Sequence, residues 1–259
     1  MSDAAGHVVA IIQARMGSTR LPGQSLEVIE ARPLLLHVVD RARAATLIDD
    51  VWIATTTQPE DDRIAETADS NGVAVYRGSV EDVLDRYVGA ARAAAADTVV
   101  RLTADDPLKD PQIIDKVVRA LIEGSHVDYA SNTLEPTYPE GLDVEVFARH
   151  TLERASREAA LPSEREHVTP YIWKHPEIFR LVSIKDDIDR SHMRWTVDYP
   201  ADLEFVRAVY GELYHGEVFS SGAVLELLAR HPGLMGVVEP HERNEGYRRS
   251  VGEEQSVDQ

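Results

Sequence analysis

The chain contains no cysteine among its 259 residues. It therefore forms no disulfide, and it cannot use a thiolate as a metal ligand or as a nucleophile. Basic residues are also scarce, because 27 Lys and Arg stand against 45 Asp and Glu and give a formal net charge of −18. Affinity for the phosphate backbone of nucleic acids depends on a basic face, so this balance argues against a general nucleic-acid-binding protein.

Long hydrophobic runs are missing as well. No apolar stretch approaches the roughly 20 residues that a membrane-spanning helix requires. The N-terminal segment enters the apolar stretch 8–12 without a basic region and without a cleavage-site pattern, so we expect no signal peptide. These absences predict a protein that does not enter a membrane and that works in the cytoplasm.

The composition that remains is that of a globular protein, with 43% hydrophobic and 28% charged residues. We find no Gly-, Ser- or Pro-rich linker, so we expect a single domain over residues 1–250, with an arm around 132–180 and a polar tail at 251–259. We expect the polar chain from Gly246 onwards to be frayed. The acidic excess is typical of a solvated surface. A phosphate-bearing substrate would then need a local cationic pocket, which makes the positions of the few arginines informative.

Hydrophobic patterns predict strands that alternate with helices, which is typical of an α/β protein. The expected strands are Val8–Ile12, Val51–Thr55, Val73–Tyr76, Thr98–Thr103, Val127–Ala130, Asp143–Phe147, Phe179–Ile184 and Arg194–Val197. The expected helices are Leu34–Ala42, Pro59–Asn71, Glu81–Ala96, Pro111–Glu123, Thr151–Ala160, Glu164–Trp173, Ala201–Leu213 and Ser221–Ala229. This order predicts a doubly wound, mostly parallel sheet with helices on both faces.

The loop after the first strand has the chemistry of an anion-binding site. Glycines at 17 and 23 let the backbone approach an anion, Ser18 and Thr19 offer hydroxyl donors, and Arg15 and Arg20 offer charge. In doubly wound sheets this loop is the usual phosphate holder. The loop matches neither Gly-x-x-x-x-Gly-Lys-Ser/Thr nor Gly-x-Gly-x-x-Gly, so it belongs to neither of those nucleotide-binding classes. A purely structural surface loop is the alternative.

Three aspartates follow predicted strands at the edge where that loop opens. Asp105 and Asp106 precede Pro107, and Asp198 precedes Tyr199 and a predicted helix. One or two carboxylates together with substrate phosphates are what Mg²⁺ prefers. The alternative for each aspartate is a helix cap or turn residue.

Several runs of the sequence resemble one enzyme family in the same order along the chain, from residue 8 to about 250. These runs are Ile11–Gly23, Ile53–Thr57, Arg77–Tyr87, Arg101–Leu108, Tyr138–Phe147, Glu166–Tyr171, Arg194–Pro200 and Asn244–Tyr247. They resemble the cytidylyltransferase family that contains the CMP-KDO and CMP-acylneuraminate synthetases, and most closely its SpsF branch of spore coat polysaccharide biosynthesis.

The resemblance implies a fold like that of nucleotide-diphospho-sugar transferases and a reaction in which a sugar or sugar-acid oxygen attacks the α-phosphorus of CTP. The products would be a CMP-sugar and pyrophosphate, used in surface-glycan synthesis. Mg²⁺ would be the cofactor, and a homodimer would form with the segment Asp143–Phe147 crossing between subunits. Neither nucleic acid nor membrane would be a partner.

The resemblance also implies roles for individual residues. The nucleotide would lie on Ala14, Arg15, Gly17, Ser18, Arg20, Gln24, Thr55, Arg77, Gly78, Ser79 and Asp82. Arg15, Arg20 and Asp105 would act in catalysis, and Asp105 and Asp198 would hold the metal. Glu145, Glu166 and His167 would face the acceptor, although a Glu on a strand and a His on a helix are commonly packing or surface residues.

One position departs from the family. The loop of the family usually continues Leu-Pro-Gly-Lys, whereas this chain has Gln24 in place of the lysine. Either Arg32 or a second cation supplies the missing charge, or turnover is slow, or the protein binds a nucleotide without transferring it. Two alternatives to a cytidylyltransferase therefore stay open. One is a glycosyltransferase of similar fold with Asp105 and Asp106 as its metal clamp, and the other is a nucleotide-binding protein that has lost catalysis. Release of pyrophosphate separates the cytidylyltransferase from the glycosyltransferase, and binding of a triphosphate without any product would indicate the protein that has lost catalysis.

Overall fold

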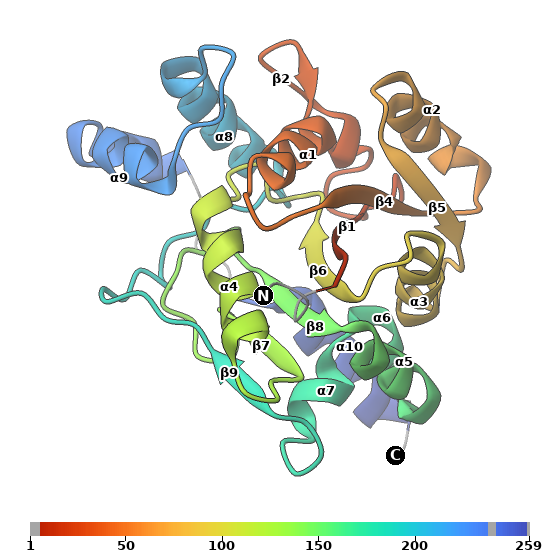
Figure 1. Ribbon diagram of the computed structural model, residues 1–259. Coiled ribbons are helices and arrows are strands. Elements are labelled where there is room, and N and C mark those ends of the chain that lie inside the picture. The colour runs from red at the N-terminus through yellow and green to blue at the C-terminus, as the bar shows by residue number, and fades with distance from the viewer. Residues whose placement is uncertain (1–5, 238–241, 258–259) are drawn as a thin grey trace.

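The central sheet of the computed structural model, which describes residues 6–237 and 242–257, has seven strands in the order β5-β4-β1-β6-β8-β7-β9 (Figure 1). Its strands are β1 (Val8–Gln13), β4 (Asp50–Thr56), β5 (Ala74–Gly78), β6 (Thr98–Thr103), β7 (Tyr129–Ser131), β8 (Glu145–Ala148) and β9 (Leu181–Ser183). A separate short hairpin consists of β2 (Val28–Ile29) and β3 (Arg32–Pro33).

The sheet is mostly parallel, as predicted. Strand β1 pairs in parallel with β4 and β6, β4 pairs in parallel with β5, and β7 pairs in parallel with β9. Strand β8 is antiparallel to both of its neighbours, β6 and β7. The carboxyl ends of β1, β4 and β6 therefore meet at one edge, and β8 begins at that same edge.

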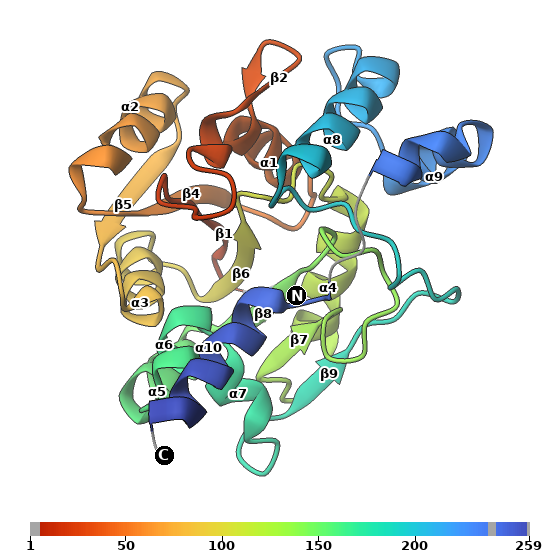
Figure 2. The ribbon, with the colours of Figure 1, turned by 180° about the vertical axis from the view of Figure 1, so that it is seen from behind.

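Helices cover both faces of the sheet, which confirms the doubly wound architecture (Figures 1 and 2). One face carries α1 (Leu34–Arg43), α2 (Asp62–Ser70), α4 (Pro111–Glu123), α8 (Pro200–Leu213) and α9 (Ser221–Arg230). The other face carries α3 (Val83–Ala93), α5 (Arg149–Glu158), α6 (Pro162–His167) and α7 (Pro170–Lys174). Short 3₁₀ turns lie at Gln24–Leu26, Pro59–Asp61 and Pro232–Val237.

Strand β1 shows why the sheet is buried on both sides. Val8, Ala10 and Ile12 pack into the core beneath α1, whereas Val9 and Ile11 pack into the core beneath α3. A continuous β-branched run suits such a strand, because successive side chains point to opposite faces and both faces are covered.

Three predicted elements differ in the structure. The predicted strand Arg194–Val197 is wrong, because this segment makes only an isolated bridge between Arg194 and Glu140. The predicted helix Glu164–Trp173 is divided into α6 and α7 at Val168, whose φ of +72° interrupts the helix. The segment from Gly246 that we expected to be frayed forms part of α10 (Glu245–Val257), which packs beside α6 (Figure 2).

The segment 132–180, expected to form an arm, contributes β8 to the interior of the sheet and α5, α6 and α7 to one face. Of the segment Asp143–Phe147 that we expect to cross between subunits, residues 145–147 lie in β8, which is hydrogen-bonded to β6 and β7 of the same chain. Residues 1–5 of the N-terminal segment and residues 258–259 of the predicted tail lie outside the described residues. Within the described residues, no helix is both long enough and apolar enough to cross a membrane.

Candidate active site

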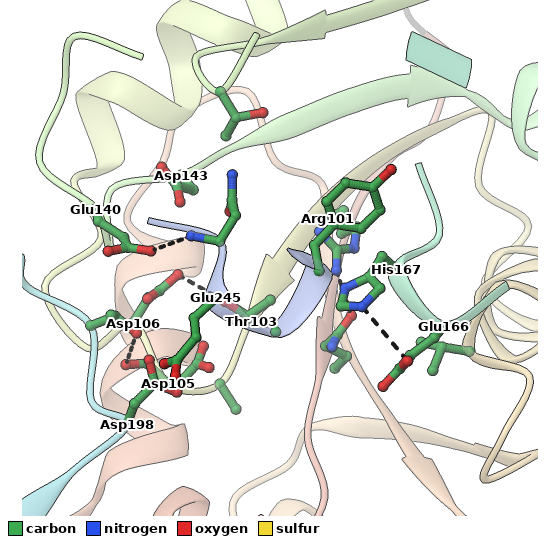
Figure 3. A pocket seen from close by; sticks show the side chains of 18 of the residues that line it. Arg101, Thr103, Asp105, Asp106, Glu140, Asp143, Glu166, His167, Asp198 and Glu245 are labelled. Atoms are coloured by element: carbon green, nitrogen blue, oxygen red, sulfur yellow. Dashed lines mark hydrogen bonds and ion pairs between the residues drawn. The ribbon is translucent and has the colours of Figure 1, made fainter. Parts of the chain in front are cut away.

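A cavity of about 550 Å³ opens at the carboxyl ends of β1 and β6, where a doubly wound sheet usually holds its ligand. Of the predicted site residues, the cavity is lined by Ala14, Arg15, Ser18, Arg20, Gln24, Asp105, Glu145, Glu166, His167 and Asp198. Figure 3 shows two groups of side chains. Asp105, Asp198 and Glu245 gather on one side, and Arg101, His167 and Glu166 gather on the other.

The loop after β1 is held in shape by its own hydrogen bonds. Asp61 accepts a hydrogen bond of 2.7 Å from the backbone N–H of Met16, and Gly23 donates its N–H to Met16 O at 3.0 Å. Gly23 has φ +76°, a conformation that favours glycine. The Arg15 side chain is exposed and has no hydrogen bond or ion pair with another described residue, so it is available to an anion.

Arg20, from the same loop, is already engaged. Its guanidinium forms an ion pair with Asp198 and a second one with Glu245 at 3.1 Å, and it lies over the ring of Tyr199 at 5.3 Å. Burial opposes the charged form, but the ion pair with Asp198 outweighs it and raises the pKa of Arg20. The structure therefore places Arg20 beside the predicted metal carboxylate.

The two neighbouring aspartates after β6 have different roles. Asp106 accepts a hydrogen bond from Thr103 Oγ1 at 2.8 Å and forms an ion pair with the buried Lys109 at 2.7 Å. Asp105 Oδ1 is buried and has no hydrogen-bond partner among the described residues. Burial, with the carboxylates of Asp106 and Asp198 nearby, raises the pKa of Asp105 to about 7. Of these two aspartates, Asp105 is therefore the one without an ion pair to any described residue.

Asp198 lines the same cavity as Asp105, although no strand directly precedes it. The N–H of Val197 donates to Asp105 O at 2.8 Å, which fixes the two segments side by side. The helix-capping role that was the alternative for Asp198 falls to Asp202, which accepts from the N–H groups of Asp198 and Tyr199, both at 2.9 Å. The carboxylate of Asp198 therefore does not cap the helix. It faces the cavity and forms ion pairs with Arg194 and Arg20.

Glu145, at the start of β8, lies in the cavity floor with both oxygens occupied. Its Oε2 pairs with Arg101, and its Oε1 accepts from Tyr129 at 2.6 Å and from Thr169 at 2.5 Å. Burial favours a raised pKa, but Arg101 and the two hydroxyls outweigh it, so the pKa of Glu145 is lowered. Glu145 thus holds Arg101 in place. Thr169 directly follows Val168, where α6 ends.

Glu166 and His167 connect α6 with α10. His167 Nε2 lies 3.0 Å from Ser250 Oγ, and that hydroxyl donates to Glu166 Oε2 at 2.8 Å. The His167 ring also packs edge-on against Tyr247 with centroids 5.3 Å apart. Burial lowers the pKa of His167 to about 4, so its imidazole is neutral at pH 7. Glu166 and His167 therefore line the cavity and also attach α10 to α6.

Six residues predicted to bind the nucleotide do not line the cavity: Gly17, Thr55, Arg77, Gly78, Ser79 and Asp82. Arg77 instead donates to Thr56 O at 2.8 Å and pairs with Asp62 at 2.7 Å, which ties β5 to β4 and α2. Asp82 caps α3 and pairs with Arg165 of α6.

The other four of these residues have no cavity contact either. Gly78 packs against Arg86, since a Cβ there would lie 3.1 Å from Arg86 Cγ. Ser79 accepts a hydrogen bond from the N–H of Asp82 at 3.0 Å. Thr55 is buried in β4, and Gly17 is exposed in the first loop.

Sequence reasoning missed several cavity residues. Arg86, Arg101 and Arg194 all line the cavity, as does Glu245 of α10. The sequence contained a signal for each of these four residues. Each is either an arginine inside an otherwise apolar strand or helix face, or lies within a run that resembles the family. Gln24 also lines the cavity, and its Oε1 is buried without a partner among the described residues.

An open, mostly parallel sheet with an arginine-bearing loop and an uncompensated carboxylate at its strand ends defines an enzyme that acts on a nucleotide or another phosphate ester. The comparisons with known proteins agree with this class. The profile of the family described as cytidylyltransferase matches residues 9–226. The chain belongs to the cytidylyltransferase family, and it is a nucleotidyltransferase.

Individual relatives cover most of the chain. The spore coat polysaccharide biosynthesis protein SpsF of Bacillus subtilis is 34% identical over 233 residues, which are 87% of this chain and 95% of SpsF. The structure of a cytidylyltransferase from Leptospira borgpetersenii superposes with a TM-score of 0.85 at 32% identity and covers 91% of this chain and 99% of that one.

A more distant structure shares the fold. CMP:2-keto-3-deoxy-manno-octonic acid synthetase, solved as a complex with CTP, has a TM-score of 0.65 at 22% identity and covers 80% of this chain and 99% of the synthetase. The fold predicted from the sequence, that of nucleotide-sugar transferases, is thereby confirmed.

Proposed function

We propose that the protein is a Mg²⁺-dependent cytidylyltransferase that transfers CMP from CTP to a hydroxyl of a sugar or sugar acid, with release of pyrophosphate, for surface polysaccharide synthesis. The observation that carries this proposal is the buried, unpartnered Asp105 Oδ1, which faces a cavity that it shares with the free guanidinium of Arg15. A carboxylate that lacks a cation and an arginine that lacks an anion match a metal–triphosphate complex.

The comparisons support the choice of substrates. SpsF is named for polysaccharide biosynthesis, and the synthetase of similar fold was solved with CTP bound. Membership of the cytidylyltransferase family favours a triphosphate donor over the nucleotide-sugar donor of a glycosyltransferase.

The residues at the strand ends suit Mg²⁺. The ion takes oxygen ligands and is commonly held by one or two carboxylates together with substrate phosphates. Asp105 and Asp198 are the carboxylates that would hold it, since Asp106 is neutralised by Lys109. Bound there, Mg²⁺ would neutralise charge on the phosphate oxygens and polarise the α-phosphorus.

The chain's own residues have the remaining tasks of binding and orientation. The acceptor hydroxyl oxygen forms a bond to the α-phosphorus and its proton is released to solvent, the bond between the α-phosphorus and the bridging oxygen breaks, and pyrophosphate leaves with the electron pair. Such a transfer needs no protein nucleophile, so the absence of cysteine is no obstacle. Arg15 and Ser18 would bind the triphosphate, and Gln24 would donate a hydrogen bond without adding charge.

The side of the cavity that holds Arg101 and His167 would take the acceptor. Arg101 is fixed there by Glu145 and by Gln13, whose Oε1 accepts from it at 3.0 Å. A positioned guanidinium and a neutral imidazole would hydrogen-bond acceptor hydroxyl or carboxylate groups. We also expect the protein to form a homodimer. Measurement of its molecular mass in solution tests this expectation.

Calorimetric titration with CTP, UTP, GTP and ATP, each with and without Mg²⁺, tests the donor before any acceptor is known. We expect selective binding of CTP that depends on Mg²⁺. Assays of pyrophosphate release with KDO, N-acetylneuraminate and neutral hexoses then test the acceptor. Tight binding of a nucleotide-sugar, with no binding of any triphosphate, would refute the proposal.

The variant Asp105→Asn tests the metal assignment. We expect it to remain folded and to lose turnover by a factor of about 10²–10³, the scale for one preorganised electrostatic contact. Asp69→Asn removes the same charge from an exposed position on α2 and is the matched control. Unchanged turnover in the Asp105 variant would remove this carboxylate from the mechanism.

A further inference from the structure

The two oxygens of Asp198 have different partners. Oδ2 pairs with Arg194, whose side chain is 9% exposed and which also binds Glu140 at 2.9 Å and Asp202 at 3.4 Å. Oδ1 pairs with Arg20, which is 27% exposed and lies on the loop after β1. The bond to Arg194 belongs to a buried network, whereas the bond to Arg20 joins the carboxylate to a surface loop.

The guanidinium of Arg20 also reaches across to α10. It binds Glu245 Oε2 at 3.1 Å, and the same oxygen accepts from Tyr199 at 3.0 Å. Figure 3 shows Glu245 beside Asp198 and Asp105, on the side of the cavity where the metal is proposed. Arg20 therefore provides positive charge at the place where a divalent cation would provide it.

A cation that binds Asp198 Oδ1 competes with Arg20, because the guanidinium already contacts that oxygen and two positive charges there repel each other. Displacement of Arg20 from Asp198 leaves its guanidinium with only the more exposed Glu245 as an anion, and this loss is offset if another anion binds it. A triphosphate in the same cavity is such an anion, since arginine binds phosphate oxygens with forked hydrogen bonds.

We propose that Arg20 is an exchangeable counter-ion of the metal site, which holds Asp198 Oδ1 and Glu245 until a triphosphate draws it away, so that cation and triphosphate bind together. This inference rests on the proposed function. It assigns Oδ1 of Asp198 to the cation and leaves Oδ2 on Arg194, which positions the carboxylate throughout. It also explains how an arginine of the phosphate loop lies against an aspartate.

The coupling is reciprocal, because a triphosphate that raises the affinity for the cation is itself bound more tightly when the cation is present. Couplings of this kind commonly correspond to factors of about 5–150 in affinity. In the absence of nucleotide, the wild-type protein should bind a divalent cation weakly. The variant Arg20→Gln, which leaves Asp198 Oδ1 without a guanidinium, should bind it about 5–150-fold more tightly.

Electron paramagnetic resonance of Mn²⁺, added alone to the full chain without nucleotide, measures this directly and needs no turnover. Arg15→Gln is the matched control, because it removes the same charge from the same cavity while Arg20 stays on Asp198. We expect the gain in Mn²⁺ affinity for Arg20→Gln, little change for Arg15→Gln, and loss of the gain in the double variant Arg20→Gln/Asp198→Asn.

Equal Mn²⁺ affinities for the wild type and Arg20→Gln would overturn the inference, and so would equal gains for Arg15→Gln and Arg20→Gln, which would reveal only a general charge effect. If the wild type binds Mg²⁺ and CTP together in calorimetry, the proposed function stands in either case. If it binds no triphosphate at all, the proposed function and this inference both fall.

Discussion

Replacing Arg194 by methionine should destabilise the fold far more than the loss of an ordinary surface ion pair. Arg194 forms ion pairs with Glu140, Asp198 and Asp202, whose side chains are only 13%, 12% and 2% exposed. Methionine keeps most of the aliphatic volume but leaves three largely buried carboxylates without their shared cation. Removing one partner of a buried ion pair typically costs about 3–5 kcal/mol, so we expect a loss of that size in the free energy of unfolding.

Urea unfolding followed by circular dichroism measures the loss, because urea is uncharged and does not screen ion pairs. The control is Arg92→Met, since Arg92 is 62% exposed and pairs with Glu153 at 3.0 Å. Such a surface pair contributes about 0–1 kcal/mol. A loss below about 1 kcal/mol for Arg194→Met, equal to that of the control, would show that the buried network does not depend on this arginine.

The pH dependence gives the same prediction a second test. Burial raises the pKa of Glu140, and Arg194 opposes that rise. Without Arg194 the pKa of Glu140 should rise further, so the folded variant should bind a proton that the unfolded chain releases. The deficit in stability should therefore be largest near neutral pH and should shrink as the pH falls through the raised pKa. A deficit independent of pH would contradict this account.

Three further predictions concern the cavity. Arg15→Ala should weaken binding of CTP about tenfold or more and affect CMP less, because a charge-assisted hydrogen bond contributes about 1.5–3 kcal/mol; equal losses in calorimetry would place Arg15 away from the β- and γ-phosphates. Gln24→Lys should tighten CTP binding by about tenfold, since it adds a cation beside the phosphates; unchanged or lower affinity and turnover would show that Gln24 is no defect. The ring signals of His167 in NMR should titrate near pH 4 rather than near the usual value of about 6.5. Between these two pH values only the unfolded chain takes up this proton, so the free energy of unfolding should fall as the pH drops from about 6.5 to about 4. A titration midpoint at or above pH ~6 would show that the imidazole is not buried beneath α10.

Most of the fold could be predicted from local sequence patterns. The strand Thr98–Thr103 and the helix Pro111–Glu123 have the predicted bounds, because each combines a clear hydrophobic period with a proline or polar residue at its end. The segment Arg194–Val197 has the composition of a strand but lacks a partner strand. Pairing is a property of the tertiary structure, so the local pattern could not reveal its absence.

The site was predictable where it lies at strand ends and less so elsewhere. Asp105 and Asp198 lie together, as their positions after predicted strands suggested, although Asp198 is held by a hydrogen bond between Val197 and Asp105 rather than by a strand. The role of Glu145 could not be predicted, because its partners Arg101 and Thr169 come from distant parts of the chain. The placement of α10 over the cavity depended likewise on long-range contacts.

The cavity is assembled from segments that lie far apart in the chain, including the loop after β1, the turn after β6, the segment around Asp198 and the start of α10. A partly folded chain that lacks any of them has no complete binding site. A nucleotide that binds only the complete cavity would act as a folding ligand, adding about 2.7 kcal/mol to stability at a concentration of 100 times its Kd. Distant destabilising substitutions would then show their effects most strongly in cells starved of the nucleotide.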